Sequence, residues 1–138
     1  MKTKFTKALA FTFILSGIWD SVAGFLYLTI IGDGRRISDP GIHPFYSIFI
    51  ASFFFCFAFL QFVSASNIKR YFFVVGSLVF GRLFYVILLY YYIIFEPSFT
   101  STFFFTGIID SIFVILYLLF SYKSGIRFAN LFKQNQLI

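Results

Sequence analysis

The strongest constraint on this 138-residue chain is a set of four long apolar runs. They cover residues 8–31, 44–64, 71–95 and 102–122. An α-helix needs about 20 mostly apolar residues to cross the hydrocarbon core of a bilayer, and each run meets that length. Only 12% of the residues are charged, against roughly 25% in soluble domains. The sequence therefore predicts an all-α membrane domain of four transmembrane helices over residues 1–122, followed by a cytoplasmic tail over 123–138.

The breaks between the runs predict how the helices are connected. Turn-forming residues occupy the first and third breaks, at Gly32-Asp33-Gly34, Asp39-Pro40-Gly41 and Glu96-Pro97-Ser98. The second break, Ala65–Arg70, is short and polar. Short connections join antiparallel neighbours, so we expect an up-down-up-down bundle.

The distribution of Lys and Arg predicts the orientation in the membrane. Cytoplasmic segments of membrane proteins carry an excess of these residues. The first and third breaks hold two of them, Arg35 and Arg36, whereas the N-terminus, the second break and the tail hold eight: Lys2, Lys4, Lys7, Lys69, Arg70, Lys123, Arg127 and Lys133. We therefore expect both termini in the cytoplasm and the chain in a bacterial inner membrane. The net charge of +6 is explained by topology and does not indicate nucleic-acid binding.

Two segments permit a second interpretation. Ser21-Val22-Ala23 after a basic, apolar start has the form of a signal-peptide cleavage site. The apolar run continues to Ile31, however, and Trp19 and Asp20 are unusual just before a cut, so a retained first span is favoured. The tail interleaves apolar with polar residues, which fits either an amphipathic helix on the inner leaflet or a solvated end.

Three charged residues lie inside the predicted spans. Asp20, Arg82 and Asp110 belong to the first, third and fourth runs. At about 1.5 Å of rise per residue, they lie roughly 18, 16 and 18 Å from the inner ends of their helices. Because the three depths agree, we expect the side chains to meet near the middle of the bilayer.

Pairing offsets the cost of burying these groups. Each isolated charge costs about 2.5–3.5 kcal/mol at a helix centre on insertion scales. The guanidinium of Arg82 offers five donors in a plane that suits carboxylates. We therefore expect Arg82 to bridge both aspartates, or to pair with one while the other is protonated.

The surroundings of the two aspartates are alike. The first span reads Ser16-Gly17-Ile18-Trp19-Asp20-Ser21, and the fourth reads Thr106-Gly107-Ile108-Ile109-Asp110-Ser111. A Leu-Tyr-Leu triplet then places Tyr27 and Tyr117 seven residues after the acids. That spacing puts each tyrosine on the helical face of its aspartate. We expect Tyr27 and Tyr117 to be hydrogen-bond partners of a ligand or ion site formed by Asp20, Arg82 and Asp110.

The other candidate residues indicate neither a catalytic site nor a metal site. The single histidine, His43, and the single cysteine, Cys56, cannot build a catalytic triad or a metal centre, so no metal or cofactor is predicted. Gln61 is expected to cap its helix or to bond across the bundle. The adjacent Phe53, Phe54 and Phe55 are interpreted as lipid-facing bulk.

Several scattered positions resemble one kind of known protein. They are Trp19-Asp20, His43-Pro44, Gly81-Arg82, and Gly107 with Asp110. Their layout resembles small bacterial four-helix membrane proteins of the BphX-like and DoxX-like kind. Some DoxX relatives are tied to quinone-linked oxidoreductases, but no redox motif is present here, so the resemblance implies a fold and no activity. Small multidrug exporters also have four helices and an acid in the first, but Arg82 and Asp110 depart from that pattern.

The sequence supports two functional hypotheses. In the first, Asp20, Arg82 and Asp110 form a mid-membrane site that binds or conducts a small polar or amphipathic ligand or a proton. In the second, the chain is an accessory or scaffolding subunit whose buried charges lock helix packing. Catalysis ranks third. The expected partners are the lipid bilayer and a second copy or a larger membrane complex.

Overall fold

The computed structural model describes residues 2–31, 44–96 and 102–128. These residues form α1 (Lys2–Leu26), the π-helical turn η1 (Tyr27–Ile31), α2 (Pro44–Ser66), α3 (Phe72–Phe95) and α4 (Thr102–Ser124). The four α-helices are long and apolar enough to cross a membrane, which confirms the prediction of four helices with the length and composition of membrane spans. The predicted features in 32–43, 97–101 and 129–138, including His43 and the turns of the first break, lie outside the described residues.

The helix ends differ slightly from the predicted spans. α1 begins at Lys2, six residues before the apolar run, because its basic first turns continue the helix. α4 continues to Ser124 and ends at Gly125, whose φ is 78°. The amides of Gly125 and Ile126 donate to the carbonyls of Tyr122 and Ser121, each over 3.0 Å, which is a Schellman-type helix end.

The chain beyond α4 turns back onto the bundle. Ile126 and Phe128 pack against the buried core. The Phe128 ring lies 6.5 Å from that of Phe72 and 5.9 Å from that of Phe80, both on α3. The first residues of the tail therefore contact protein instead of continuing α4 as one longer helix.

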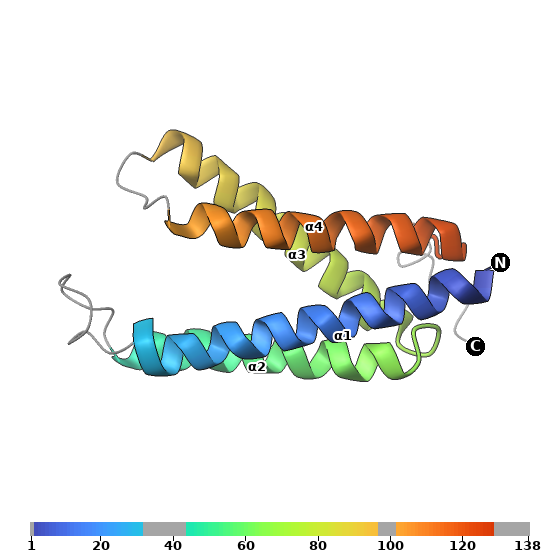
Figure 1. The fold of residues 1–138 in the computed structure, drawn as a ribbon, viewed down its shortest axis with the longest axis horizontal. Coiled ribbons are helices and arrows are strands. Elements are labelled where there is room, and N and C mark those ends of the chain that lie inside the picture. The colour runs from blue at the N-terminus through green and yellow to red at the C-terminus, as the bar shows by residue number, and fades with distance from the viewer. Residues whose placement is uncertain (1, 32–43, 97–101, 129–138) are drawn as a thin grey trace.

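The extent of packing differs from one pair of neighbouring helices to another. α1 contacts α2 along most of its length and contacts α4 on another side, while α2 and α3 touch only over a short stretch. Figure 1 shows why: α3 begins near the end of α2 and diverges from α1 and α2 toward its own C-terminal end. Residues of α2 and α3 line a cavity beside this divergence.

Glycines on α1 allow the close approach of α2. A Cβ atom added to Gly24 would lie 3.2 Å from the Phe54 Cβ and 3.3 Å from the Ala51 carbonyl oxygen. A Cβ on Gly17 would lie 2.7 Å from the Phe62 ring. Small residues at such positions let membrane helices pack backbone to backbone. The α1–α2 contact is thus the closest-packed part of the fold.

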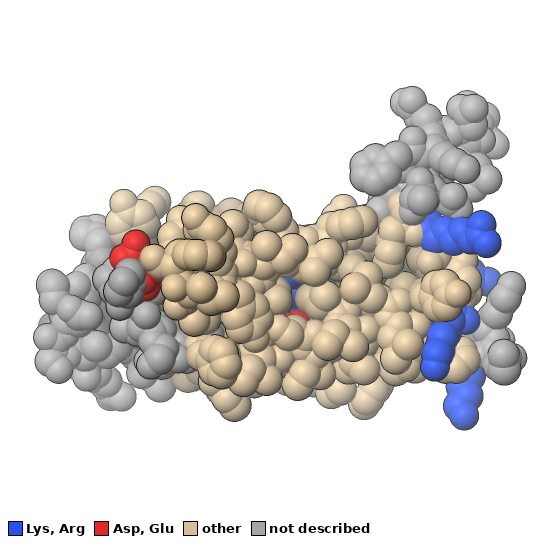
Figure 2. Space-filling view, turned by 90° about the horizontal axis from the view of Figure 1, so that it is seen from above, with Lys and Arg blue, Asp and Glu red and all other residues tan. Residues whose placement is uncertain are grey.

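The two halves of the bundle differ in packing and in charge. The largest buried apolar cluster lies in one half and comprises Leu9, Phe13, Ile68, Val75, Leu78, Val79 and Tyr117. The start of α1, the α2–α3 connection and the end of α4 lie at that end of the molecule (Figure 1). Figure 2 shows Lys and Arg side chains gathered at the same end, and an almost uncharged surface along the middle. We call this end the basic end.

Candidate functional site

The three charged residues of the predicted spans meet in the centre of the bundle. Arg82 on α3 forms ion pairs with Asp20 on α1 and with Asp110 on α4. Its Nη2 contacts Oδ2 of Asp20, and its Nη1 donates to Oδ1 of Asp110 over 2.5 Å. The three side chains are only 5–9% exposed. The expected bridge of both aspartates by Arg82 is confirmed.

Gln61 connects α2, the one helix without a charged residue in the cluster, to these ion pairs. Its Nε2 donates to Oδ2 of Asp20 over 2.6 Å, so this oxygen accepts from both Gln61 and Arg82. α2 contains no charged residue, and Gln61 is its polar contribution to the centre of the bundle. We refer to Asp20, Gln61, Arg82 and Asp110 together as the central cluster. Its bonds connect all four helices.

The guanidinium of Arg82 contacts two carboxylates and one aromatic ring. Both terminal nitrogens face carboxylates, and its Cζ lies 5.3 Å from the centre of the Phe113 ring. A cation over an aromatic face is attracted by the ring quadrupole. Arg82 is therefore held on two edges and on one face by residues of the protein.

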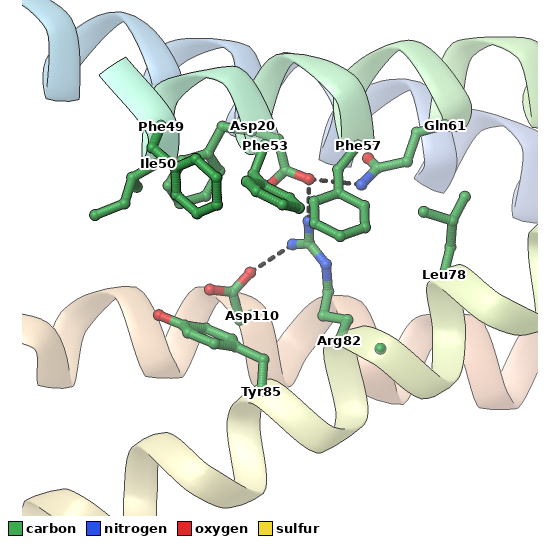
Figure 3. A pocket seen from close by; sticks show the side chains of 12 residues that line it. Asp20, Phe49, Ile50, Phe53, Phe57, Gln61, Leu78, Arg82, Tyr85 and Asp110 are labelled. Atoms are coloured by element: carbon green, nitrogen blue, oxygen red, sulfur yellow. Dashed lines mark hydrogen bonds and ion pairs between the residues drawn. The ribbon is translucent and has the colours of Figure 1, made fainter. Parts of the chain in front are cut away.

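The central cluster forms one wall of a cavity of about 330 Å³. Phe49, Phe53 and Phe57 of α2 line it on the same side as Asp20 and Gln61, and Arg82 and Asp110 reach it from the other side (Figure 3). The other lining residues are Ile50, Phe54, Leu78, Gly81 and Tyr85. A small number of converging polar groups in an otherwise apolar hollow is the usual form of a ligand site.

A second, smaller cavity of about 110 Å³ adjoins the same acid. Phe54, Tyr85 and Asp110 line both cavities. The smaller one is completed by residues of α1, η1 and α4: Trp19, Val22, Ala23, Leu26, Tyr27 and Thr106. Apart from Leu78, residues of the large apolar cluster line neither cavity. The hollow part of the bundle therefore lies on the side of the central cluster away from the basic end.

The two tyrosines predicted for the site occupy different places. Tyr27 lies in η1, lines the smaller cavity and stacks on Phe54 with ring centres 5.6 Å apart. Tyr117 is fully buried and stacks on Phe13, with ring centres 4.5 Å apart. It lines neither cavity. The structure thus brings Tyr27 near Asp110 and leaves Tyr117 in the core at the basic end, and the site role of both stays a prediction.

Some lining residues had a recognisable signal in the sequence. Tyr85 lies three residues after Arg82, which places both on one face of a helix. Phe53 and Phe57 precede Gln61 by eight and four residues and share its face. The interpretation of Phe53 and Phe54 as lipid-facing bulk was incomplete, because both line a cavity as well.

Comparison with known proteins identifies no relative of this chain. No family model, curated protein or solved structure matches the chain. The resemblance to BphX-like and DoxX-like proteins stays a prediction. Within residues 2–31, 44–96 and 102–128, no group of three or more His, Cys, Asp or Glu side chains is placed to hold a metal ion.

Proposed function

We propose that this chain is an integral protein of a bacterial inner membrane that binds a small polar or amphipathic ligand at mid-membrane. The observation that carries the proposal is the position of the central cluster: its charges form a wall of a 330 Å³ cavity instead of being sealed by side chains. In membranes, ionisable groups that face a cavity usually mark a ligand or ion pathway. The volume is within the range of small-molecule sites, about 300–1,000 Å³.

An up-down-up-down topology with both termini in the cytoplasm belongs to the same proposal. Contacts between helices support it. Phe5 near the start of α1 stacks on Phe120 near the end of α4. Along α1, Gly17 lies against Phe62 of α2, and the later Gly24 lies against the earlier Phe54. The Lys and Arg side chains gathered at the basic end support a cytoplasmic position for that end (Figure 2). The cavities would then lie at mid-membrane and toward the outer half.

In the proposed site each polar residue has a role. Asp20 and Asp110 are the acids that interact with the polar part of the ligand. Arg82 is their counter-ion and holds both carboxylates in place. Tyr27 and Tyr117 were predicted as hydrogen-bond partners, and the position of Tyr27 beside Asp110 in the smaller cavity supports a role for that residue.

Tryptophan fluorescence provides a direct test, because Trp19 is the only tryptophan and lies next to Asp20 in the sequence. Purified protein in phosphatidylcholine nanodiscs would be titrated with 4-phenylbutylamine, 4-phenylbutyrate and 4-phenylbutanol, which share one apolar body and differ in the polar group. At least one probe should change Trp19 emission in a saturable way. If none of the three does so, the proposal is wrong.

A cavity-filling variant locates the response. A Cβ atom on Gly81 meets no other atom within 4 Å, so Gly81→Leu would place its side chain in the cavity. We expect this variant to lose the saturable response. Cys56→Leu is the matched control, because Cys56 is exposed and lines neither cavity, and it should respond as the unmodified protein does.

The second candidate function is a scaffolding subunit whose central cluster only locks helix packing. The connection of all four helices through Asp20, Gln61, Arg82 and Asp110 favours it. Asp20→Asn and Asp110→Asn separate the two functions. A variant that folds but loses or changes the response to at least one probe supports the binding site, whereas lost assembly without any probe response in the unmodified protein supports the scaffold.

A further inference from the structure

Each carboxylate of the central cluster keeps one acceptor oxygen that Arg82 does not take. Arg82 takes one oxygen of each carboxylate, Oδ2 of Asp20 and Oδ1 of Asp110. The second oxygen of Asp110 points toward the Tyr85 hydroxyl side of the cavity in Figure 3. Gln61 uses its amide nitrogen on Asp20, while its Oε1 is buried without a hydrogen-bond partner. This amide therefore supports Asp20 from within the protein, and the second oxygens of the two carboxylates are the acceptors left for a ligand.

The charge of the site is also unbalanced. Two acids face one base, which leaves one excess negative charge when both carboxylates are ionised. No other charged residue lines either cavity. The charge of Arg82 is already balanced by the two carboxylates with which it pairs, so the cluster has no net attraction for an anion. The excess charge is therefore open to neutralisation by a cation.

The aromatic wall adds a second preference for a cation. Phe45, Phe49, Phe53 and Phe57 follow one another at four-residue intervals on α2, and the next position in the series is Gln61. Their successive ring centres are 6.0, 4.8 and 6.3 Å apart, so the rings form a continuous row that leads to the central cluster. Aromatic faces attract ammonium groups and also accommodate apolar bodies.

From these three observations we infer that the ligand of the proposed site is an amphipathic organic cation: an ammonium group bound at Asp110 and Asp20, with its apolar body against the phenylalanines of α2. This inference rests on the proposed function. It goes further by specifying the charge and the shape of the ligand. An inorganic cation has no apolar body to cover the phenylalanines, and an anion would be repelled by the excess negative charge.

The three phenylbutyl probes test the inference by their order of affinity. In zwitterionic nanodiscs, 4-phenylbutylamine, protonated at neutral pH, should bind at least about tenfold more tightly than the alcohol or the carboxylate. Saturable binding with the alcohol or carboxylate equal or tighter would overturn the cation assignment and leave the proposed function standing. No saturable binding of any probe would overturn both.

Two variants separate the contributions of charge and aromatic surface. Asp110→Asn removes the excess charge, so it should abolish the preference for the amine while alcohol binding persists. Phe57→Leu retains every charge and should weaken amine binding by about threefold. Phe59→Leu, on the same helix, 65% exposed and away from the cavities, should change nothing. An amine preference unchanged in both Asp110→Asn and Phe57→Leu would contradict the assignment.

Discussion

Gln61 donates to Asp20 across the α1–α2 interface over 2.6 Å, with both residues buried. The acceptor is the oxygen that Arg82 also contacts, so an uncharged helix is connected to the charged cluster through one atom. This bond lies within the closest-packed helix pair, and the shared Asp20 oxygen joins it to the ion pairs through which Arg82 connects α3 with α1 and α4. Several measurable consequences depend on it and on the cluster around it.

Replacing Gln61 by leucine should destabilise the protein. Gln61→Leu removes a donor to a buried carboxylate, and hydrogen bonds to charged groups contribute about 1.5–3 kcal/mol. The free energy of unfolding should fall by about that amount, measured by SDS-induced unfolding in mixed micelles. Ser52→Ala is a suitable control on the same helix, because Ser52 is exposed and its hydroxyl donates to the Ile48 carbonyl within the same helix. Equal stability of Gln61→Leu and the unmodified protein would mean that the bond contributes nothing.

Loss of Arg82 should be more damaging than loss of the whole charged group. Arg82→Met leaves two carboxylates facing each other, and removing one partner of a buried pair typically costs about 3–5 kcal/mol. A triple variant with Asp20→Asn, Arg82→Met and Asp110→Asn contains no unpaired charge. It should therefore be more stable than Arg82→Met alone in the same unfolding assay. Additive losses across the three sites would show that the charges do not interact.

The glycines of α1 and α3 should respond in opposite ways to added bulk. Gly24→Leu places a side chain against the Phe54 Cβ and the Ala51 carbonyl, so it should push α1 from α2 at a cost of about 1–3 kcal/mol. Gly81→Leu enters open space and should keep or raise the midpoint of thermal unfolding, since leucine favours helix more than glycine does. The opposite order of the two midpoints would show that the space beside Gly81 is filled in the native protein.

The proposed orientation can be measured by cysteine labelling in intact cells. In a Cys56→Ala background, Ser66→Cys at the end of α2 and Glu96→Cys after α3 give single thiols at exposed positions. A membrane-impermeant maleimide added outside should label the cysteine at 96 and reach that at 66 only after the cells are opened. The reverse pattern would place the basic end outside and contradict the proposal.

The prediction of the charged cluster from depth alone succeeded because a membrane limits the possibilities. Asp20, Arg82 and Asp110 lie at similar distances along their helices, and an unpaired charge at that depth is costly, so meeting was the favourable outcome. The two tyrosines show what a shared helical face leaves undetermined. Phe13, seven residues before Asp20, stacks on Tyr117, seven residues after Asp110, so the two tyrosines lie on opposite sides of the central cluster. Tyr27 lines a cavity and Tyr117 does not, and the site role of both stays a prediction.

The sequence by itself therefore determined the four helices, the basic end and the depth of the charges, because these depend on hydropathy, on charge and on a constant rise per residue. The tertiary structure alone decided that α3 diverges from α2, that Gln61 completes the cluster and that phenylalanines of α2 line a cavity beside it. Those features depend on the angle at which helices cross and on which side chains fill the space between them. Hydropathy does not distinguish a phenylalanine that faces lipid from one that faces a cavity.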